Sequence, residues 1–309
     1  MKQVVVVAAG TDETAEGVQH ALTRLGARVH FLDTSRIPED GALSLQDSVV
    51  RSGDVVLSEA RSVYVKSVHL GVPLFDVDSL AARKPKSWPQ RWVAERERHA
   101  LITSALRAME AGGAHFVNSV SRFEVHLLKP LQTELLARAQ VPVPSSLATN
   151  DPQAVRAFAE QHGDVIYKPL AGGALVRRLE AKDLTPRRLS ALATAPVLFQ
   201  QRIEGLEYRV TVLAGEAIAA YRLPARGVVD AREVLERAKK VKVPRHVGEV
   251  CVRAASALGL VFTSVDVRVR DDGAPFVLEC NPTPSVAFYE SPARSPILLA
   301  LAAHLLAHA

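Results

Sequence analysis

The sequence has little cysteine and no long apolar run, and both shortages narrow the classes of protein it can belong to. Of its 309 residues only two are cysteines, Cys251 and Cys280, which excludes the disulfide framework of small secreted domains. No stretch approaches the roughly 18 apolar residues that cross a bilayer. The apolar run at residues 4–9 is too short for a secretory signal and leads into a polar segment, not a cleavage site. We therefore expect a cytoplasmic protein with no membrane partner.

Aromatic residues are scarce too, at 5% of the chain, although 38 basic residues against 33 acidic ones give a net charge of +5. An excess of basic residues is typical of proteins that bind nucleic acid, because lysine and arginine neutralise phosphates. The basic stretches at residues 91–98, 177–188 and 239–245 are interleaved with acidic residues or proline, and Trp92 is the one aromatic residue among them. We expect solvated helix faces and no nucleic-acid partner, with nucleic-acid binding as the minor alternative. A basic site could equally hold small phosphates or an acidic substrate.

The sequence does contain a regular alternation of strand and helix patterns at its start. Residues 4–9 have the pattern of a buried strand, residues 15–25 that of an amphipathic helix, and residues 28–32 that of the next strand. This βαβ opening implies a parallel sheet. The turn at residues 10–12 lacks the three-glycine dinucleotide fingerprint, so a nicotinamide-binding domain is not expected.

The remainder of the chain alternates helices with short antiparallel strand pairs, which is typical of an α+β arrangement. Glycine, proline and helical spacing predict helices at residues 91–111, 152–161, 246–258 and from 296 onward. Strand pairs are expected at residues 165–168 with 174–179, 208–213 with 217–222, and 260–270 with 274–280. At about twice the usual domain length, the chain should form two or three packed units.

The strongest local chemical signal is Glu279-Cys280-Asn281-Pro282, with Asp266 on the preceding strand. Because side chains alternate along a strand, Glu279 and Asn281 point to one face and Cys280 to the other. Carboxylate and amide oxygens suit a hard cation such as Mg²⁺, which takes a few protein oxygens together with substrate phosphates. The alternative is the solvent-facing polar side of an ordinary hairpin, and these residues alone do not decide between the two.

Two lysines are candidates for binding phosphate. Lys168 ends a hydrophobic strand just before the turn that contains Gly172 and Gly173, and a glycine turn lets backbone N–H groups approach a phosphate. The spacing is not that of a Walker A motif, so a surface lysine is the alternative. Lys129, on a helical segment, has weaker support still.

Taken in order, these segments resemble the ATP-grasp superfamily, within the branch of ribosomal-protein glutamate ligases, bacterial glutathione synthetase and ribosomal-peptide-modifying ligases. The collinear set is more specific than any one motif, and it covers the chain from about residue 118 to the end. The segments are Asn118, Lys129, the Val-Pro-Val-Pro junction at 141–144, Ile166-Tyr167-Lys168-Pro169, Phe199-Gln200-Gln201-Arg202-Ile203, Glu207-Tyr208-Arg209-Val210, Ser264-Val265-Asp266-Val267-Arg268 and Leu278-Glu279-Cys280-Asn281-Pro282.

The resemblance implies an α/β (α+β) ATP-grasp fold, in which a parallel α/β domain is followed by two α+β subdomains that clamp ATP. We expect the first domain at residues 1–117, the central subdomain with its lid at 118–199, and the C-terminal subdomain with its metal site at 200–309. Expected ligands are ATP and two Mg²⁺ ions, for which Mn²⁺ can substitute. The sequence leaves the oligomeric state open, and a homo-oligomer is one alternative, since relatives are commonly dimers or tetramers.

The resemblance also implies a role for individual residues. The phosphates would be held by Lys129 and Lys168 under a lid at Gly172 and Gly173. The adenine would be read by Gln200, Gln201, Arg202 and Ile203, the ribose would lie near Glu204 or Glu207, and the metals would be bound by Asp266, Glu279 and Asn281. The transferred phosphoryl group and the acyl phosphate would be held by Arg209 and Arg222, whose alternative is exposed hairpin arginines. Arg232 and Ser285 are the candidates for contacting the substrate.

The activity implied is ATP- and Mg-dependent ligation of a carboxylate to an amine through an acyl phosphate, which forms an amide or peptide bond on an amino acid, peptide or small metabolite. Arginine and lysine would offset the repulsion between carboxylate and phosphate anions. The lid is short and poor in glycine, and Pro284-Ser285 stands where relatives often have glycine. A non-catalytic nucleotide- or peptide-binding relative is therefore the alternative, and a thiol or hydroxyl acceptor is also open.

Overall fold

The computed structural model describes residues 2–37, 41–68, 88–171 and 174–309 and divides into two compact units. The first comprises residues 1–120 together with 285–309, and the second comprises 121–284. Residues 285–309 thus group with the first unit and not with the predicted C-terminal subdomain. The predicted division between residues 199 and 200 falls inside the second unit and stays a prediction. None of the helices within the described ranges has both the length and the apolar character needed to cross a membrane.

The first unit is built on a parallel sheet in the order β2-β1-β6-β7, as the βαβ opening predicts. Val4 to Val7 of the central strand are fully buried, because a parallel sheet is covered on both faces. Two helices far apart in sequence, α1 and α8, pack together in this unit. Its elements are β1 (Gln3–Ala8), α1 (Glu13–Arg24), β2 (Arg28–Asp33), β3 (Leu43–Gln46), β4 (Val49–Ser52), β5 (Val55–Val56), β6 (Ser62–Val65), α3 (Trp88–Ala111), β7 (His115–Val117) and α8 (Pro296–Ala307).

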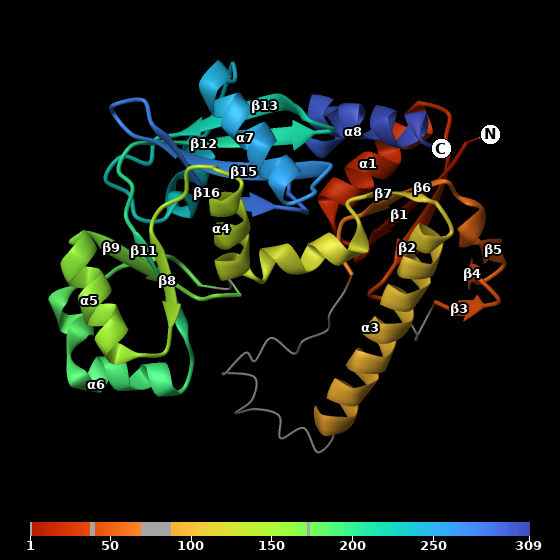
Figure 1. Ribbon diagram of the computed structural model, residues 1–309. Coiled ribbons are helices and arrows are strands. Elements are labelled where there is room, and N and C mark those ends of the chain that lie inside the picture. Colours follow the sequence, from red (N-terminus) through yellow and green to blue (C-terminus); the bar gives the residue numbers. More distant parts are fainter. Residues whose placement is uncertain (1, 38–40, 69–87, 172–173) are drawn as a thin grey trace. The chain divides into compact units, whose positions relative to one another are not determined.

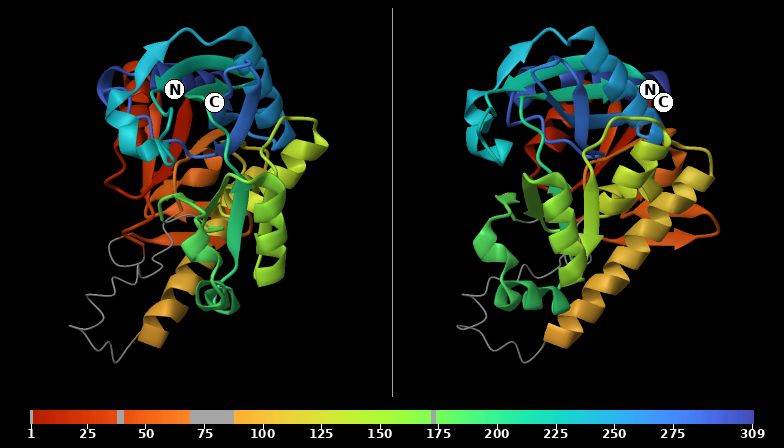
Figure 2. Two further views of the ribbon diagram at one scale, coloured as in Figure 1. Left: turned by 90° about the vertical axis from the view of Figure 1, so that its left-hand side faces the viewer. Right: turned by 60° about the vertical axis from the view of Figure 1, so that its left-hand side comes forward.

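The second unit begins with an antiparallel sheet in the order β10-β9-β11-β8. Figure 2 shows helix α5, in yellow-green, beside this sheet. Val155 and Phe158 of α5 pack there against Val165 and Phe199, while the Asp151 side chain caps the helix by accepting from the Gln153 N–H at 2.8 Å. The elements are α4 (Lys129–Arg138), β8 (Ser146–Thr149), α5 (Pro152–His162), β9 (Val165–Lys168), β10 (Arg177–Arg178), α6 (Pro186–Leu189) and β11 (Val197–Gln201).

A larger antiparallel sheet completes the second unit in the order β14-β13-β12-β15-β16. Helix α7 lies across one face of it (Figure 1), and buries Val247, Cys251 and Ala254 against apolar side chains of the strands. The opposite face is therefore the one that can present polar groups. The elements are β12 (Leu206–Leu213), β13 (Glu216–Leu223), β14 (Lys239–Val241), α7 (Arg245–Ala257), β15 (Phe262–Val269) and β16 (Pro275–Asn281).

Candidate active site

Two carboxylates face each other on adjacent strands of the larger sheet. Asp266 of β15 pairs directly with Glu279 of β16, and Ser264 pairs with Asn281 two residues further on. Because paired residues of an antiparallel ladder share a face, Asp266, Glu279 and Asn281 project from the same side of the sheet. The structure thus brings the three predicted metal-binding residues together.

Basic side chains surround this carboxylate pair. Lys129 Nζ donates to Glu279 Oε1, and His126 Nδ1 lies 3.1 Å from the same oxygen. Arg209, opposite Asp266 on β12, places its Nε 2.7 Å from Asp266 Oδ1. Opposite charges at these distances favour the ionised carboxylates, so the cations offset the repulsion between Asp266 and Glu279.

The pKa values of the two carboxyl groups respond differently to this environment. Burial alone would raise the pKa of Glu279, but contacts with His126 and Lys129 lower it to about 2. Burial raises the pKa of Asp266; Arg209 opposes the rise and Glu279 adds to it. Glu279 is therefore a permanent anion at neutral pH, while the charge of Asp266 depends on the cation beside it.

A glutamine that the sequence analysis did not single out fixes Lys129 in place. Gln132, one turn along α4 and 3% exposed, accepts from the Cys280 N–H at 2.7 Å and donates to the Cys280 carbonyl at 3.0 Å. Its amide also donates to the Val125 carbonyl at 3.2 Å. These bonds hold α4 against β16. The available signal was the i, i+3 spacing of Lys129 and Gln132, which puts both on one helix face.

Lys168 lies at the end of β9 and contacts β11. Its Nζ donates to Gln200 Oε1 at 3.4 Å, and Gln200 Nε2 donates to Ser146 Oγ at 3.0 Å. Burial lowers the pKa of Lys168, Glu279 opposes that effect and Lys129 adds to it. Both predicted phosphate-binding lysines are thus close enough to Glu279 to sense its charge. Gly172 and Gly173, predicted to form the lid, lie outside the described residues.

The predicted adenine-binding segment has much of its hydrogen-bonding capacity in use. The N–H of Gln201 donates to the Ser145 carbonyl at 2.8 Å and that of Arg202 to the Asp164 carbonyl at 2.9 Å. The Ile203 carbonyl accepts from Arg268 Nη1 at 3.1 Å. The Arg202 side chain contacts Asp164 at 3.0 Å and also pairs with Glu204.

The two glutamates predicted near a ribose differ in access. Glu207 and Arg268 form a buried ion pair with N–O distances of 3.0 Å. Burial raises the pKa of Glu207, as does Asp266, whereas Arg268 lowers it. The side chain of Glu204 is 55% exposed. Of the pair, Glu204 is the one a ribose can reach.

Three predicted site residues lie outside the direct contacts of the carboxylate pair, although Arg232 is close enough to it that Glu279, after Asp230, raises the pKa of its guanidinium. Arg222 pairs with Tyr208, which packs against the core beneath α7, so the register puts Arg222 on the opposite face of the sheet from Arg209. Arg232 pairs with Asp230 and donates to the Ala174 carbonyl at 2.7 Å. Ser285 begins the segment that groups with the first unit. The alternation of side chains along the hairpin therefore does not bring Arg222 to the face that holds Arg209, and its role at the reacting centre stays a prediction.

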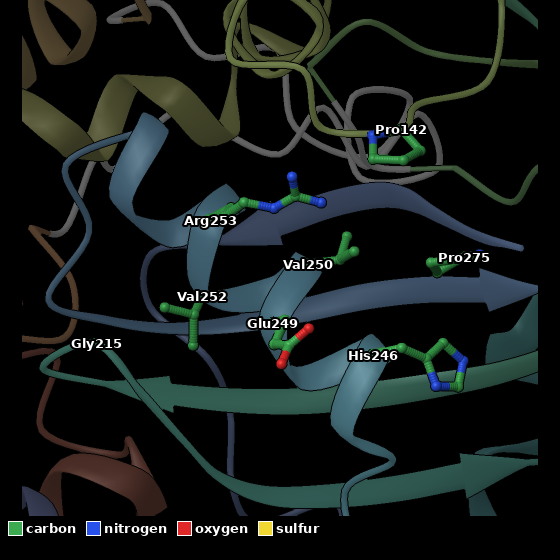
Figure 3. A pocket seen from close by; sticks show the side chains of 8 residues that line it. All are labelled: Pro142, Gly215, His246, Glu249, Val250, Val252, Arg253 and Pro275. Carbon is green, nitrogen blue, oxygen red and sulfur yellow. The ribbon is translucent and has the colours of Figure 1, made fainter.

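A pocket of about 850 Å³ lies at α7 (Figure 3), and none of the predicted site residues lines it. The side chains of His246, Glu249 and Arg253 follow one another along the helix there. The lining residues are Pro142, Gly215, His246, Glu249, Val250, Val252, Arg253 and Pro275. The carboxylate cluster, by contrast, lies on the face of the sheet away from α7.

Comparison with known proteins places this geometry in a family. The family described as prokaryotic glutathione synthetase, ATP-grasp domain, matches residues 110–271. A tetrahydromethanopterin:alpha-L-glutamate ligase from Methanosarcina acetivorans is 28% identical over 184 residues, 52% of this chain and 56% of that protein. A glutathione synthetase from Mesorhizobium japonicum is 30% identical over 141 residues, 40% of this chain and 44% of that protein. The chain spans about half the length of these curated relatives.

Solved structures extend the likeness over the whole chain. The ATP-grasp ligase PsnB, complexed with a phosphomimetic variant of its minimal precursor, Mg and ADP, superposes with a TM-score of 0.86 at 34% identity, covering 99% of this chain and 98% of that one. The macrocyclase MdnC from Microcystis aeruginosa MRC, bound with the precursor peptide MdnA, has a TM-score of 0.80 at 20% identity and covers 99% of each chain, which shows a common fold. The chain belongs to the ATP-grasp ligase family, and the expected fold class and resemblance are confirmed.

Proposed function

We propose that this chain uses ATP to activate a carboxylate as an acyl phosphate and then joins it to an amine. The observation that carries the proposal is the meeting of Asp266 and Glu279 with Lys129, Lys168 and Arg209 on one side of the second unit. Opposed carboxylates surrounded by cations are what binding of a metal–triphosphate complex requires. The reaction belongs in the cytoplasm, where ATP is supplied.

The donor set fits Mg²⁺. The oxygens of Asp266, Glu279 and Asn281 project from one face, and Mg²⁺ prefers a few carboxylate or amide oxygens together with phosphate oxygens. PsnB has been solved with Mg and ADP, which supports assigning Mg²⁺ and an adenine nucleotide to this site. That two ions bind, and that Mn²⁺ can replace Mg²⁺, is our further proposal. When bound, the ions supply charge neutralisation and orientation of the phosphates.

The chain's own residues would then position ATP. Lys129 and Lys168 hold the α- and β-phosphates, and residues 172–173 belong to the lid above them. Gln200, Gln201, Arg202 and Ile203 form the adenine edge, with Glu204 at the ribose. Lys129 exchanges its present contact with Glu279 for a phosphate oxygen, which leaves the carboxylate to bind the metal.

The chemical steps follow from the charges present. A carboxylate oxygen of the substrate bonds to the γ-phosphorus while the bond to the β–γ bridging oxygen breaks, and ADP leaves. The amine nitrogen then bonds to the carbonyl carbon, inorganic phosphate leaves, and the amine loses a proton. Arg209 contacts the transferred phosphoryl group, because a guanidinium matches planar arrays of oxygen. The same role for Arg222 stays a prediction that requires rearrangement at the end of β13.

The substrate class that we propose is a peptide. PsnB, similar over nearly the full chain, is complexed with a minimal precursor and with the precursor peptide PsnA2. Arg232 is our candidate for gripping a substrate carboxylate, with Ser285 as a further contact. Glutathione synthetases and glutamate ligases among the relatives favour a free amino acid or small metabolite as the second candidate.

The test measures release of ADP and phosphate by the purified chain with ATP and Mg²⁺, against short acidic peptides carrying lysine, serine or threonine and against free amino acids. Release of ADP should depend on the presence of one substrate class. If that substrate is a peptide joined to itself, the mass of the peptide should fall by one water. Glu279→Gln should abolish release, whereas the exposed Glu249→Gln on α7 should leave it unchanged. ATP bound without release in any mixture would instead support a non-catalytic binding protein.

A further inference from the structure

Three histidines meet in the first unit, outside the candidate active site. His304 lies in the last turn of α8, His308 follows at the helix C-cap, and His115 is the first residue of β7. The i, i+4 spacing of His304 and His308 puts them on one side of the helix. Their sequence separation from His115 hides the cluster from any local motif search.

The ring nitrogens of the three side chains converge. His115 Nε2 and His304 Nε2 are 3.1 Å apart, and one ligating atom from each of the three rings can be chosen so that all lie within 4.8 Å of one another. Nitrogens that bind one tetrahedral Zn²⁺ at about 2.0–2.1 Å are about 3.3 Å apart. The first pair already has this spacing. The His308 ring is stacked on that of His115, with centroids 3.9 Å apart and 14° between the planes, so this exposed side chain has to turn before its Nε2 reaches the same ion.

The backbone and a carbonyl contact orient these rings. His308 Nδ1 lies 2.9 Å from the His304 carbonyl, a contact in which Nδ1 carries the proton and Nε2 keeps its lone pair. Hydrogen bonds of this kind typically hold a metal-binding histidine in the required tautomer. His115 is fixed by its own N–H, which donates to the Arg61 carbonyl at 2.8 Å in the parallel sheet.

The donor set of the cluster decides which ions it can hold. Three imidazoles without a carboxylate suit borderline transition metals and not Mg²⁺ or Ca²⁺.

We propose that His115, His304 and His308 form a binding site for one divalent transition-metal ion of the Zn²⁺ class, which links helix α8 to strand β7. Three protein ligands leave a further coordination position for water or another ligand. The ligands of this site belong to the first unit, whereas the carboxylate cluster belongs to the second.

The experiment titrates Zn²⁺ into the chelator-treated full chain in the presence of excess Mg²⁺, which competes with Zn²⁺ for the carboxylate cluster. Calorimetry should show one ion per chain. His308→Ala, an exposed position chosen to preserve folding, should weaken Zn²⁺ binding at least about tenfold. The exposed His20→Ala on α1 serves as the matched control and should leave affinity unchanged.

A second readout reports the ligands directly. Co²⁺ bound to the wild-type chain should give the d–d absorption of a low-coordinate site with nitrogen donors. This absorption should be lost in the triple variant His115→Gln/His304→Gln/His308→Gln. Zn²⁺ should also raise the Tm of the wild type and the His20→Ala variant but not of the triple variant. Equal Zn²⁺ affinity and equal Co²⁺ spectra in the wild type and the triple variant would overturn the proposal.

Discussion

At the scale of single residues, the charge beside each carboxylate decides what that carboxylate can do. Glu279 contacts His126 and Lys129, and because these contacts lower its pKa it stays ionised. Asp266 has Arg209, the only one of the two predicted catalytic arginines that the strand register puts on its face. Arg209 therefore has the strongest geometric support for a role at the reacting centre.

Replacing Arg209 tests that role. Arg209→Ala removes a cation from the place where phosphoryl charge develops, so kcat for ADP release should fall by about two to three orders of magnitude. Arg209→Lys keeps the charge without the planar fork and should recover a part of the loss. Arg138→Ala, which changes an exposed arginine on α4, should behave as wild type. Unchanged kcat in Arg209→Ala would remove it from the mechanism.

The two cysteines should be chemically inert. Both Cys251 and Cys280 are fully buried, and burial raises the pKa of each thiol above its usual range. Because the thiolate is the reactive form, native protein should be alkylated by iodoacetamide at least about tenfold more slowly than chain unfolded in urea. Mass spectrometry over time measures this. Equal rates in both states would show that the helix α7 and strand β16 around them open readily.

At the scale of elements, the contact between α4 and β16 sets the position of Lys129. Gln132→Ala would leave the N–H and carbonyl of Cys280 buried without their side-chain partner. Such groups cost about 1–3 kcal/mol each, so the free energy of unfolding should fall by about 2–3 kcal/mol. Urea denaturation measures the loss. Gln161→Ala, at an exposed position of α5, should change stability by less than about 0.5 kcal/mol; equal effects would contradict the bracing role.

Asp230 connects the strand region after the predicted lid to the segment Ala231–Arg237. It is 4% exposed, accepts from the Val176 N–H at 2.8 Å, and pairs with Arg232. Burial alone would raise its pKa, but Arg232 and the Val176 N–H lower it below the usual 3.8. A lowered carboxyl pKa means stability that is present above the unfolded value and is lost as the pH falls through the folded value.

The Asp230→Asn variant should show this dependence. It should unfold about 2 kcal/mol more easily than wild type near pH 7, because hydrogen bonds to a charged group are lost. The difference in unfolding free energy between wild type and variant should narrow as the pH falls below about 3.8. In that range the wild-type Asp230 carboxyl is protonated first in the unfolded chain and, at lower pH, in the folded chain as well. Urea titrations at both pH values measure the gap. A gap independent of pH would mean that the Asp230 charge does not stabilise the fold.

At the scale of the whole molecule, local patterns predicted the elements well. The helix ending at Ala111 before two glycines, the hairpin of β12 and β13, and the pair β15 and β16 all occur. Strand alternation was enough to predict that Glu279 and Asn281 share a face. Each of these depends on neighbours in sequence or on the period of two along a strand.

What the sequence could not predict depends on distant partners. The bond between Gln132 and Cys280 joins positions 148 residues apart, and the grouping of residues 285–309 with the first unit has no local signal. The face on which Arg222 lies was not predictable for the same reason, since it is set by the pairing register of β13. Register is fixed by the packing of the whole sheet, which one strand does not contain.

The measurement that tests the central claim most directly follows oxygen atoms through the reaction. With a substrate identified by ADP release, its carboxylate is labelled with a heavy oxygen isotope and the products are analysed by mass spectrometry. An acyl phosphate transfers one labelled oxygen to inorganic phosphate when the amine displaces it, so the account predicts singly labelled phosphate and unlabelled ADP. Labelled AMP, or phosphate free of label beside ligated product, would contradict it.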